Sequence, residues 1–203
     1  MKIQRLSEAD FSSSTWSGGK TTEMLLYPSG TSYAARDFDF RISSATVRDG
    51  TSEFTLLPGV ERQLMVLEGR TVLTHDGGAP VPLPPYVPHH FSGGSRTASR
   101  GACTDFNVML RRGWTAKLSA LHLNNEGQTT VFAAADFAVL YFAENAGWVQ
   151  NGGELLRCGA KELVVLERER GEPLCASVFA PRGCVVVQAL LRRGQNAAKK
   201  QSL

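Results

Sequence analysis

The chain has 203 residues, of which 42% are hydrophobic, so it can bury the core of one domain or of two small fused domains. Its net charge of +3 is concentrated at the end, because the last twelve residues include Arg192, Arg193, Lys199 and Lys200. The sequence has no basic stripe with aromatic partners, no membrane-length apolar run and no apolar leader core. We therefore expect a cytoplasmic protein that binds neither nucleic acid nor membranes, with a basic, flexible tail over residues 192–203.

Short strands separated by turns are predicted along the first half of the chain. The 20 glycines and nine prolines of the sequence supply turns that end each apolar run after a few residues. The predicted strands cover residues 1–6, 20–28, 38–47, 54–57, 63–67, 70–75 and 104–112. We expect a polar loop over residues 12–19, a proline-rich edge strand or loop over 81–88, and a flexible loop over 92–100.

The second half repeats this style without obvious sequence identity to the first. Residues 114–128 are interpreted as a crossing segment, and a short helix is left open near residues 116–123 or 133–136. Strands are then predicted over residues 129–133, 137–143, 147–150, 154–157, 162–166, 174–180 and 184–191. Turn signals every 8–12 residues or so are typical of all-β folds. We therefore expect two small antiparallel β-barrels, over residues 1–113 and 114–191, and strands exchanged between the halves remain open.

Two of the predicted strands carry polar side chains on one face. In residues 38–47 one face holds Phe38, Phe40 and Ile42, and the other holds Asp39, Arg41, Ser43 and Ala45. In residues 104–112, Asp105, Asn107 and Met109 share a face. Such a face can line a hydrated cavity inside a barrel or meet solvent.

Arg62 stands out in the stretch of residues 54–69, which reads as a strand, a Pro58-Gly59 turn and a second apolar strand. Together with Arg41 it is the leading candidate to hold a carboxylate, because a guanidinium offers a planar fork of N–H donors. The alternative is structural pairing. In that case Arg41 would pair with Asp39 or Asp105, and Arg62 with Glu61 or Glu23.

Further candidate ligand contacts flank these arginines. Thr21, Thr22 and Glu23 follow Gly18-Gly19, where the backbone could approach a ligand, although an ordinary loop into a strand is the alternative. Asp105 and Asn107, with Ser43, could orient the arginines, bind a ligand amide or satisfy backbone groups. Trp16 could cap a pocket or fill the barrel as an apolar plug.

The sequence argues against metal, nucleotide and nucleophile chemistry. His89 and His90 are adjacent and point to opposite faces of an extended segment, and His75 and His122 have no partner at ligand spacing. The run Gly-Gly-Lys-Thr lacks the first glycine of a P-loop, and no nucleophile triad is recognisable. The four cysteines form no Cys-x-x-Cys pair and are expected to be reduced and mostly buried. We therefore expect no cofactor, no metal and no catalytic residues.

Two successive barrels resemble the bicupin layout, and residues 59–69 resemble the first cupin motif. If Gly69 is the closing glycine, the acid of that motif falls at Arg62 and its two histidines near residues 55–58, where no histidine occurs. Four stretches resemble the HutD/Ves family in order and spacing, and together they span most of residues 16–113. They are residues 16–23, 37–47, 57–69 and 105–109.

The resemblance implies a non-metal bicupin associated with histidine utilisation in many bacteria. It implies a sensor or regulator that binds a small acidic metabolite such as formylglutamate or formiminoglutamate. It carries no established catalysis, so we lean against an enzyme. The alternatives are a cupin enzyme, metal-free or metal-dependent, acting on a small acidic substrate, or a stress-related interaction protein. Bicupins often form homodimers, so a homodimer remains open.

Overall fold

The structure is a computed structural model, and it describes residues 1–48, 50–124, 128–169 and 172–194. The chain divides into two compact units. The N-terminal barrel comprises Phe11–Trp114, and the C-terminal barrel comprises Met1–Asp10 with the chain from Thr115 onward. The first ten residues therefore join the C-terminal barrel, whereas the sequence placed them in a first unit of residues 1–113.

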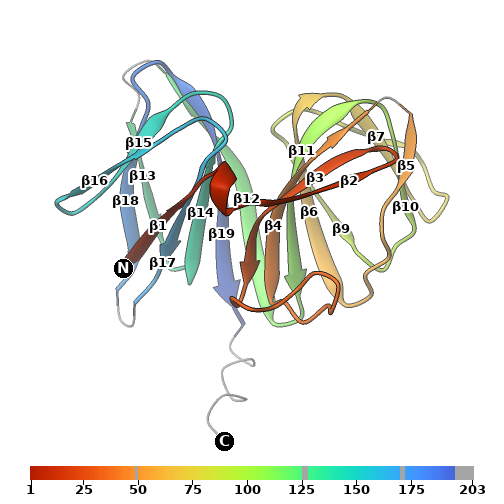
Figure 1. Cartoon of the computed structure of the whole chain (residues 1–203), viewed down its shortest axis with the longest axis horizontal. Coiled ribbons are helices and arrows are strands. Elements are labelled where there is room, and N and C mark those ends of the chain that lie inside the picture. Colours follow the sequence, from red (N-terminus) through yellow and green to blue (C-terminus); the bar gives the residue numbers. More distant parts are fainter. Residues whose placement is uncertain (49, 125–127, 170–171, 195–203) are drawn as a thin grey trace, which may run out of the picture. The chain divides into compact units, whose positions relative to one another are not determined.

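The N-terminal barrel consists of two facing antiparallel sheets (Figure 1). Its larger sheet has the strand order β2-β3-β4-β11-β6-β9. The bounds of these strands, in the same order, are Ser12–Trp16, Gly19–Tyr27, Phe40–Val47, Cys103–Arg111, Val60–Gly69 and Pro88–Ser92. The smaller sheet has the order β5-β10-β7-β8, with bounds Thr51–Glu53, Thr97–Arg100, Thr71–His75 and Val81–Leu83.

The C-terminal barrel also consists of two antiparallel sheets. One has the order β1-β17-β14-β19-β12, with bounds Lys2–Leu6, Leu163–Glu167, Phe137–Phe142, Cys184–Arg193 and Trp114–Leu123. The other has the order β13-β18-β15-β16, with bounds Gln128–Ala133, Leu174–Phe179, Gly147–Asn151 and Glu154–Cys158. In the first sheet β1 pairs along its whole length with β17, from Lys2 opposite Glu167 to Leu6 opposite Leu163. The predicted all-β fold with two barrels is confirmed.

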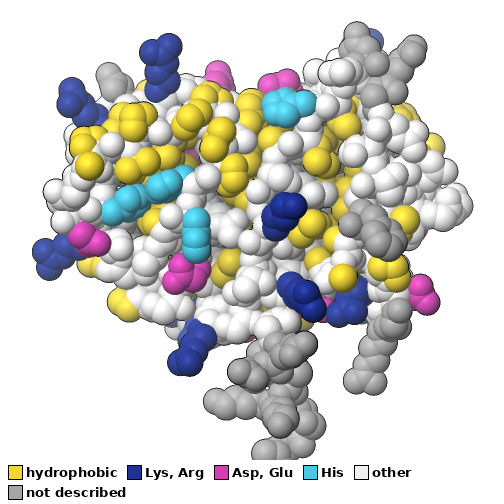
Figure 2. Space-filling view, turned by 180° about the vertical axis from the view of Figure 1, so that it is seen from behind, with side chains coloured by type: hydrophobic (Ala, Val, Ile, Leu, Met, Phe, Trp, Pro, Cys, Tyr) yellow, Lys and Arg dark blue, Asp and Glu magenta, His cyan; other side chains and the backbone are white. Residues whose placement is uncertain are grey.

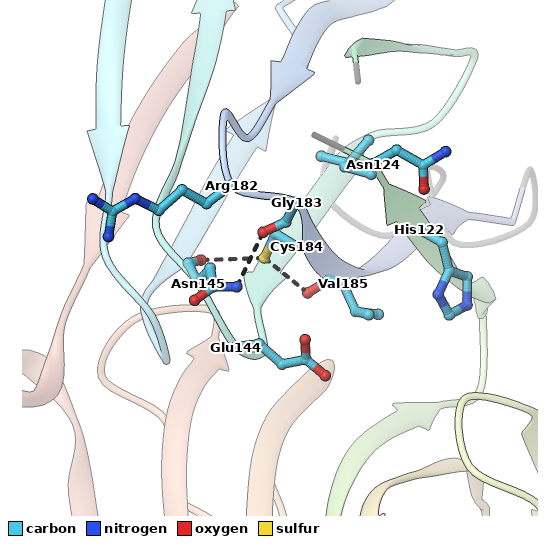
Figure 3. A pocket seen from close by; sticks show the side chains of 9 residues that line it. His122, Asn124, Glu144, Asn145, Arg182, Gly183, Cys184 and Val185 are labelled. Atoms are coloured by element: carbon cyan, nitrogen blue, oxygen red, sulfur yellow. Dashed lines mark hydrogen bonds between the residues drawn. The ribbon is translucent and has the colours of Figure 1, made fainter. Parts of the chain in front are cut away.

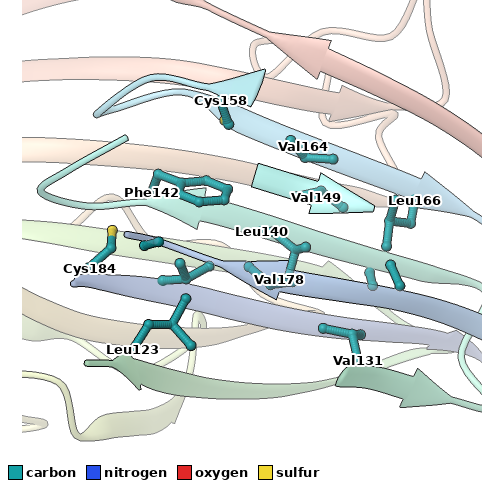
Figure 4. Packing of buried hydrophobic residues seen from close by; sticks show 14 of the residues in the cluster. Leu123, Val131, Leu140, Phe142, Val149, Cys158, Val164, Leu166, Val178 and Cys184 are labelled. Atoms are coloured by element: carbon teal, nitrogen blue, oxygen red, sulfur yellow. The ribbon is translucent and has the colours of Figure 1, made fainter. Parts of the chain in front are cut away.

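Each barrel has its own apolar core. In the C-terminal barrel the inward faces of both sheets meet around Leu140, Phe142, Val164, Leu166 and Val178, all fully buried (Figure 4). In the N-terminal barrel a cluster that includes Leu64, Val66, Leu73 and Leu83 fills one part of the interior. A further apolar cluster of Phe38, Leu57, Val60 and Met109 fills another part. The candidate site lies in the polar part of this interior.

Several expected elements differ from the structure. Residues 12–16 form β2 rather than a loop, because they pair with β3 from Ser12 opposite Glu23 to Trp16 opposite Gly19. Residues 114–123 form β12 beside β19 instead of the expected crossing segment, and the helix left open near residues 116–123 is absent. The loop expected over residues 92–100 contains β10. The strand predicted at residues 54–57 is absent, and the strand of this region, β5, covers Thr51–Glu53.

Helical structure is scarce in the part of the chain that is described. It consists of the 3₁₀ turn η1 (Glu8–Asp10), so the helix considered at residues 133–136 is absent. No helix among the described residues is long and apolar enough to cross a membrane. All four cysteines carry free thiols, and all but Cys175 are buried. The tail predicted over residues 192–203 lies mostly outside the described residues.

Candidate functional site

A cavity of about 420 Å³ opens into the polar part of the N-terminal barrel. Strands of both sheets of this barrel and the segments beside them line it, and its walls are Ser14, Trp16, Thr21, Tyr33, Arg41, Ser43, Ala45, Val47, Ser52, Glu53, Phe54, Thr55, Arg62, Asp105, Asn107 and Met109. The exposed Ser14, Glu53 and Thr55 lie at its mouth, and buried polar residues form its floor. Ligand pockets are typically about 300–1,000 Å³, so the volume suits a small metabolite.

Strand register brings the polar residues of the floor together. Met109 of β11 lies opposite Arg41 of β4 on one side and Arg62 of β6 on the other, so the three form one row. The next row along β11 places Asn107 opposite Ser43. Because side chains alternate along a strand, these rows point to the same face. Of the two alternatives left open by the sequence, a cavity lining or a solvent-facing surface, the structure shows the cavity lining.

Arg62 is buried without a counter-ion. Its exposed fraction is 6%, and no carboxylate of the described residues lies within ion-pair distance of it. Its Nη2 donates a long hydrogen bond of 3.4 Å to Asn107 Oδ1, and its Nε is fully enclosed with no hydrogen-bond partner. The guanidinium lies over the rings of Phe54, at 4.6 Å, and Phe91, at 5.2 Å. These aromatic faces hold the cation but satisfy none of its N–H donors.

Burial lowers the pKa of Arg62 to about 10 because the guanidinium is removed from water. Neighbouring Tyr33 and Asp105 oppose that shift, and Arg41 adds to it. The side chain therefore remains a cation at neutral pH. The structural partners considered from the sequence are both occupied elsewhere, since Glu61 pairs with His90 and Glu23 with Arg41.

Arg41 is equally buried but has its counter-ion. Its Nε donates to Glu23 Oε2 at 2.6 Å, and its Nη1 donates to Ser43 Oγ at 3.0 Å. The ring of Tyr33 lies against the guanidinium, 4.4 Å from its central carbon to the ring centroid. The structural pairing left open for Arg41 therefore exists, although Glu23 provides it instead of Asp39 or Asp105.

Asp105 and Asn107 continue the polar floor. Asp105 Oδ1 accepts hydrogen bonds from Asn107 Nδ2, at 2.5 Å, and from the Ala45 backbone N–H, at 3.2 Å. Asn107 therefore bridges the two charged groups, because its oxygen accepts from Arg62 and its amide donates to Asp105. Burial raises the pKa of the Asp105 carboxyl to about 7, against the hydrogen bond from Ala45 and the attraction of Arg62.

Most of the predicted site residues converge on this cavity. It is lined by Trp16, Thr21, Arg41, Ser43, Arg62, Asp105 and Asn107. Glu23 does not line it but holds Arg41. Thr22 lies on the other face of β3, where its hydroxyl is 3.1 Å from that of Ser13. Trp16 forms part of the cavity wall, and its indole N–H donates to Thr21 Oγ1 at 3.1 Å.

Sequence reasoning missed the aromatic side chains that flank the arginines. Tyr33 lies in the segment between β3 and β4, and no pattern in that segment indicates that it reaches the cavity. Phe54 follows β5 directly and was interpreted as the start of a strand, not as a wall of the site. The one signal in the sequence is that Phe54 precedes Arg62 by a few residues. An aromatic residue so close to an arginine in sequence is too common to predict a contact between them.

The histidines form a separate cluster in the N-terminal barrel. His75 Nε2 and His89 Nε2 are 2.9 Å apart, and His75 Nδ1 lies 2.8 Å from Thr97 Oγ1. Figure 2 shows histidine side chains among hydrophobic ones on one face of the molecule. The two ring planes differ by 18° and the ring centroids are 5.1 Å apart. The 2.9 Å between the two nitrogens is a hydrogen-bond distance. Within the described residues no group of three or more potential metal ligands occurs.

A second hollow of about 590 Å³ lies in the C-terminal barrel (Figure 3). Its polar interior is satisfied locally. The Cys184 thiol donates to the Asn145 and Val185 carbonyls, and Asn145 Nδ2 donates to the Gly183 carbonyl at 3.1 Å. Arg182 is exposed and, in Figure 3, points away from His122. This hollow therefore lacks the buried, unpaired charge that distinguishes the first cavity.

Comparison with known proteins gives the family of the chain. The profile of the HutD family matches residues 8–178, which is most of the sequence. The chain belongs to the HutD family. This HutD protein is also 38% identical over 99 residues to protein Ves of Citrobacter koseri. That match covers 46% of the chain and 49% of the relative, so the chain spans about half the length of this curated protein.

Solved structures show the same fold at low sequence identity. A conserved protein of unknown function from Pseudomonas aeruginosa PAO1 matches with a TM-score of 0.82 and 23% identity, over 95% of this chain and 99% of that one. HutD from Pseudomonas fluorescens SBW25, solved in a formate condition, matches with a TM-score of 0.75 and 24% identity over the same shares. The nickel(II) complex of the pirin YhhW from Escherichia coli matches with a TM-score of 0.68 and 10% identity, over 95% and 100%. The resemblance to HutD/Ves bicupins is confirmed.

Proposed function

We propose that the N-terminal barrel binds the carboxylate of a small acidic metabolite, and that the protein acts as a sensor or regulator without catalysis. The HutD family is associated with histidine utilisation, so the acids to consider first are N-formylglutamate and formiminoglutamate. Either carries carboxylates for an arginine and an amide-like group for the polar side chains beside it.

The observation that carries the proposal is Arg62. An ion in a protein interior normally has a counter-ion and a full set of hydrogen bonds, because unpaired burial is costly. Arg62 has neither, and its guanidinium faces a cavity of about 420 Å³. A bound carboxylate would supply the missing charge and accept from the free N–H donors.

The two arginines divide the work in this proposal. Arg62 makes the direct, charge-assisted hydrogen bonds to the acid, since no carboxylate of the described residues holds it and its hydrogen bond to Asn107 is long, at 3.4 Å. Arg41 acts on the acid mainly through its electrostatic potential. Its Nε already donates a hydrogen bond to Glu23 and its Nη1 donates one to Ser43. Ser43 and Asn107 form the next row on the adjacent strands β4 and β11, where their polar atoms can contact the rest of the ligand.

Titration calorimetry with N-formylglutamate, formiminoglutamate and formate tests the proposal on the native protein and on Arg62→Met. The substitution keeps an unbranched apolar stem but removes the positive charge and every N–H donor of the guanidinium. We expect a loss of roughly 3 kcal/mol, or about 100-fold in affinity. Arg70→Met is the matched control, because Arg70 is exposed between β6 and β7 and lies outside the cavity.

A folding measurement separates lost binding from lost structure. Arg62→Met removes an unpaired buried charge, so its thermal unfolding temperature in the absence of ligand should be at least that of the native protein. The proposal is wrong if the native protein gives no heat with any of these acids, or if Arg62→Met binds them as tightly as the native protein does.

A further inference from the structure

Asp105 is a second buried charge without a counter-ion in the same cavity. Its exposed fraction is 3%, and no lysine or arginine of the described residues lies within ion-pair distance. Both of its hydrogen bonds, from Ala45 and Asn107, go to Oδ1. The described residues provide no donor to Oδ2, and the side chain lines the cavity.

A chain of polar groups connects this carboxyl to the anion site. Arg62 donates to Asn107, and Asn107 donates to Asp105. The three side chains therefore lie on one face of β6 and β11, at adjacent positions of the register. A carboxylate that binds to Arg62 consequently lies close to Asp105, inside a region screened from water.

The other charged groups around the cavity do not neutralise Asp105. Arg41 is engaged by Glu23, which makes that pair neutral as a whole. Glu53 of β5 lies exposed at the mouth and, as an acidic residue, offers Asp105 no positive charge. The Cys103 thiol, two residues away on β11, stays protonated because burial and Asp105 raise its pKa to about 12. Tyr33 lies beside Arg41.

We propose that Asp105 is the proton acceptor of the cavity, so that an acid bound to Arg62 enters together with one proton, which Asp105 takes up. The inference rests on the proposed function, because it presumes an anion at Arg62. Two carboxylates that share a buried site cannot both be ionised without a large repulsion. The proton comes from solvent and ends on Asp105 Oδ2, which becomes an O–H donor to the bound acid.

The ionisation of Asp105 in the ligand-free protein suits its role as a proton acceptor. Burial already raises the pKa of Asp105 to about 7, so the carboxyl is partly ionised near neutral pH. A bound anion raises that pKa further. Above pH 7 the affinity therefore falls as the pH rises, by up to about tenfold per unit, until the pKa of the complex is reached. Below pH 7 the carboxyl is already neutral and the affinity levels off.

Calorimetry of the full chain with N-formylglutamate and formate, in two buffers with different heats of ionisation at pH 8, measures the proton directly. We expect an uptake approaching one proton per bound acid. Asp105→Asn imitates the neutral carboxyl, since its Oδ1 still accepts from Ala45 and Asn107 and its amide donates. This variant should bind the acid with no proton uptake and with an affinity that does not change between pH 6 and pH 9.

Thr104→Ser is the matched control, because Thr104 is the preceding residue of β11 and its hydroxyl lies on the exposed face, 3.4 Å from that of Thr46. It should keep the proton uptake. A purely structural Asp105 would shift the affinity equally at every pH, which the pH series distinguishes. Heat that is independent of buffer and pH overturns this inference but leaves the proposed function standing, whereas no heat with either acid overturns both.

The stability of the free protein gives a second measurement. The pKa of Asp105 is raised above its unfolded value, so the folded state binds more protons between about pH 4 and pH 7. Its contribution to stability is therefore present at low pH and is lost as the pH rises toward 7. As the pH rises from 4 to 7, the unfolding free energy of Asp105→Asn should increase relative to that of the native protein. If the difference between the two proteins stays constant over this range, Asp105 does not ionise there.

Discussion

Arg41 and Arg62 show that burial alone does not decide what an arginine does. Both side chains are 6% exposed and both face the same cavity. Glu23 reaches Arg41 from the neighbouring strand β3, whereas the strand on the far side of β6 places Phe91 beside Arg62. One cation is thus held by a carboxylate and the other by aromatic rings. The difference lies in one neighbouring side chain.

Glu23→Gln should therefore have opposite effects on stability and binding. It leaves Arg41 without its counter-ion, and we expect a destabilisation of about 1–3 kcal/mol because a buried charged hydrogen bond is weakened. It also adds an uncompensated cation to the cavity, which should tighten acid binding by about 1–2 kcal/mol, or five- to thirtyfold. Urea unfolding and calorimetry measure the two effects.

Glu61→Gln is the control for that variant. Glu61 is exposed on β6, one residue from Arg62, and pairs with His90 outside the cavity. It should change neither binding nor stability appreciably. Unchanged acid binding in Glu23→Gln would show that the charge of Arg41 does not reach the ligand.

The sequence predicts the site residues that lie on strands, because side chains alternate between the two faces of a strand. It does not predict the site residues that lie in the segments between strands. Periodicity alone predicts that Arg41 lies on the polar face of β4, and that Asp105 and Asn107 share a face of β11. Tyr33 and Phe54 were not predictable, because each lies outside the strands and reaches the cavity through a connection with no periodic pattern. The pairing of Arg41 with Glu23 depends on the register of β3 and β4, which the sequence leaves free.

Among the elements, strand β6 has a glycine, Gly69, as its last residue, and the structure explains why. Gly69 ends this strand with a φ of +80°, a conformation that L side chains rarely adopt. A Cβ there would lie 2.3 Å from the Ala102 carbonyl oxygen, at the start of β11. The strand therefore needs a glycine both for its backbone angle and for close approach to its neighbour.

Gly69→Ala should destabilise the protein by about 2–4 kcal/mol, since it combines an unfavourable φ with a clash against backbone. Gly77→Ala is the matched control. Its φ is +72°, but nothing lies within 4 Å of the added carbon, so it should show the conformational cost alone, about 1 kcal/mol. Chemical denaturation of both variants checks the difference, and equal losses would exclude the clash at Ala102.

The strands missed from the sequence share one cause. The polar segment Ser12–Trp16 has no apolar alternation, and it becomes β2 because the edge of β3 is available to pair with it. Trp114–Leu123 contains alanine, lysine and leucine, which favour helices, yet it is held as β12 beside β19. Tertiary pairing outweighed local propensity in both cases, and strands with clean alternation, such as β4, were predicted to within two residues.

At the scale of the whole molecule, strand β1 precedes the N-terminal barrel in sequence but pairs within the C-terminal barrel. Lys2–Leu6 completes the sheet of the C-terminal barrel against β17, although more than 150 residues separate the two strands. The cavity residues all lie within Phe11–Trp114. Damage to β1 should therefore affect one barrel and spare the site in the other.

Deletion of residues 1–7 tests that separation. It leaves the edge of β17 unpaired, and we expect faster amide exchange in Leu163–Glu167 and in its other neighbour β14, with binding of acid retained. Hydrogen exchange with mass spectrometry resolves these segments from β11. Lys2→Ala is the control, because it removes only an exposed side chain whose ion pair with Glu167 spans 3.8 Å. Equal loss of protection in β11 and β17 would refute independent barrels.

The pairing of β1 with β17 also sets an order of events during translation. The strand Lys2–Leu6 is made before the N-terminal barrel, whereas its partner Leu163–Glu167 is made only after the whole of that barrel. That barrel can fold while β1 is still unpaired, so β1 is made before the barrel but pairs after it. A nascent chain of this protein should therefore form its acid-binding cavity before β1 pairs with β17.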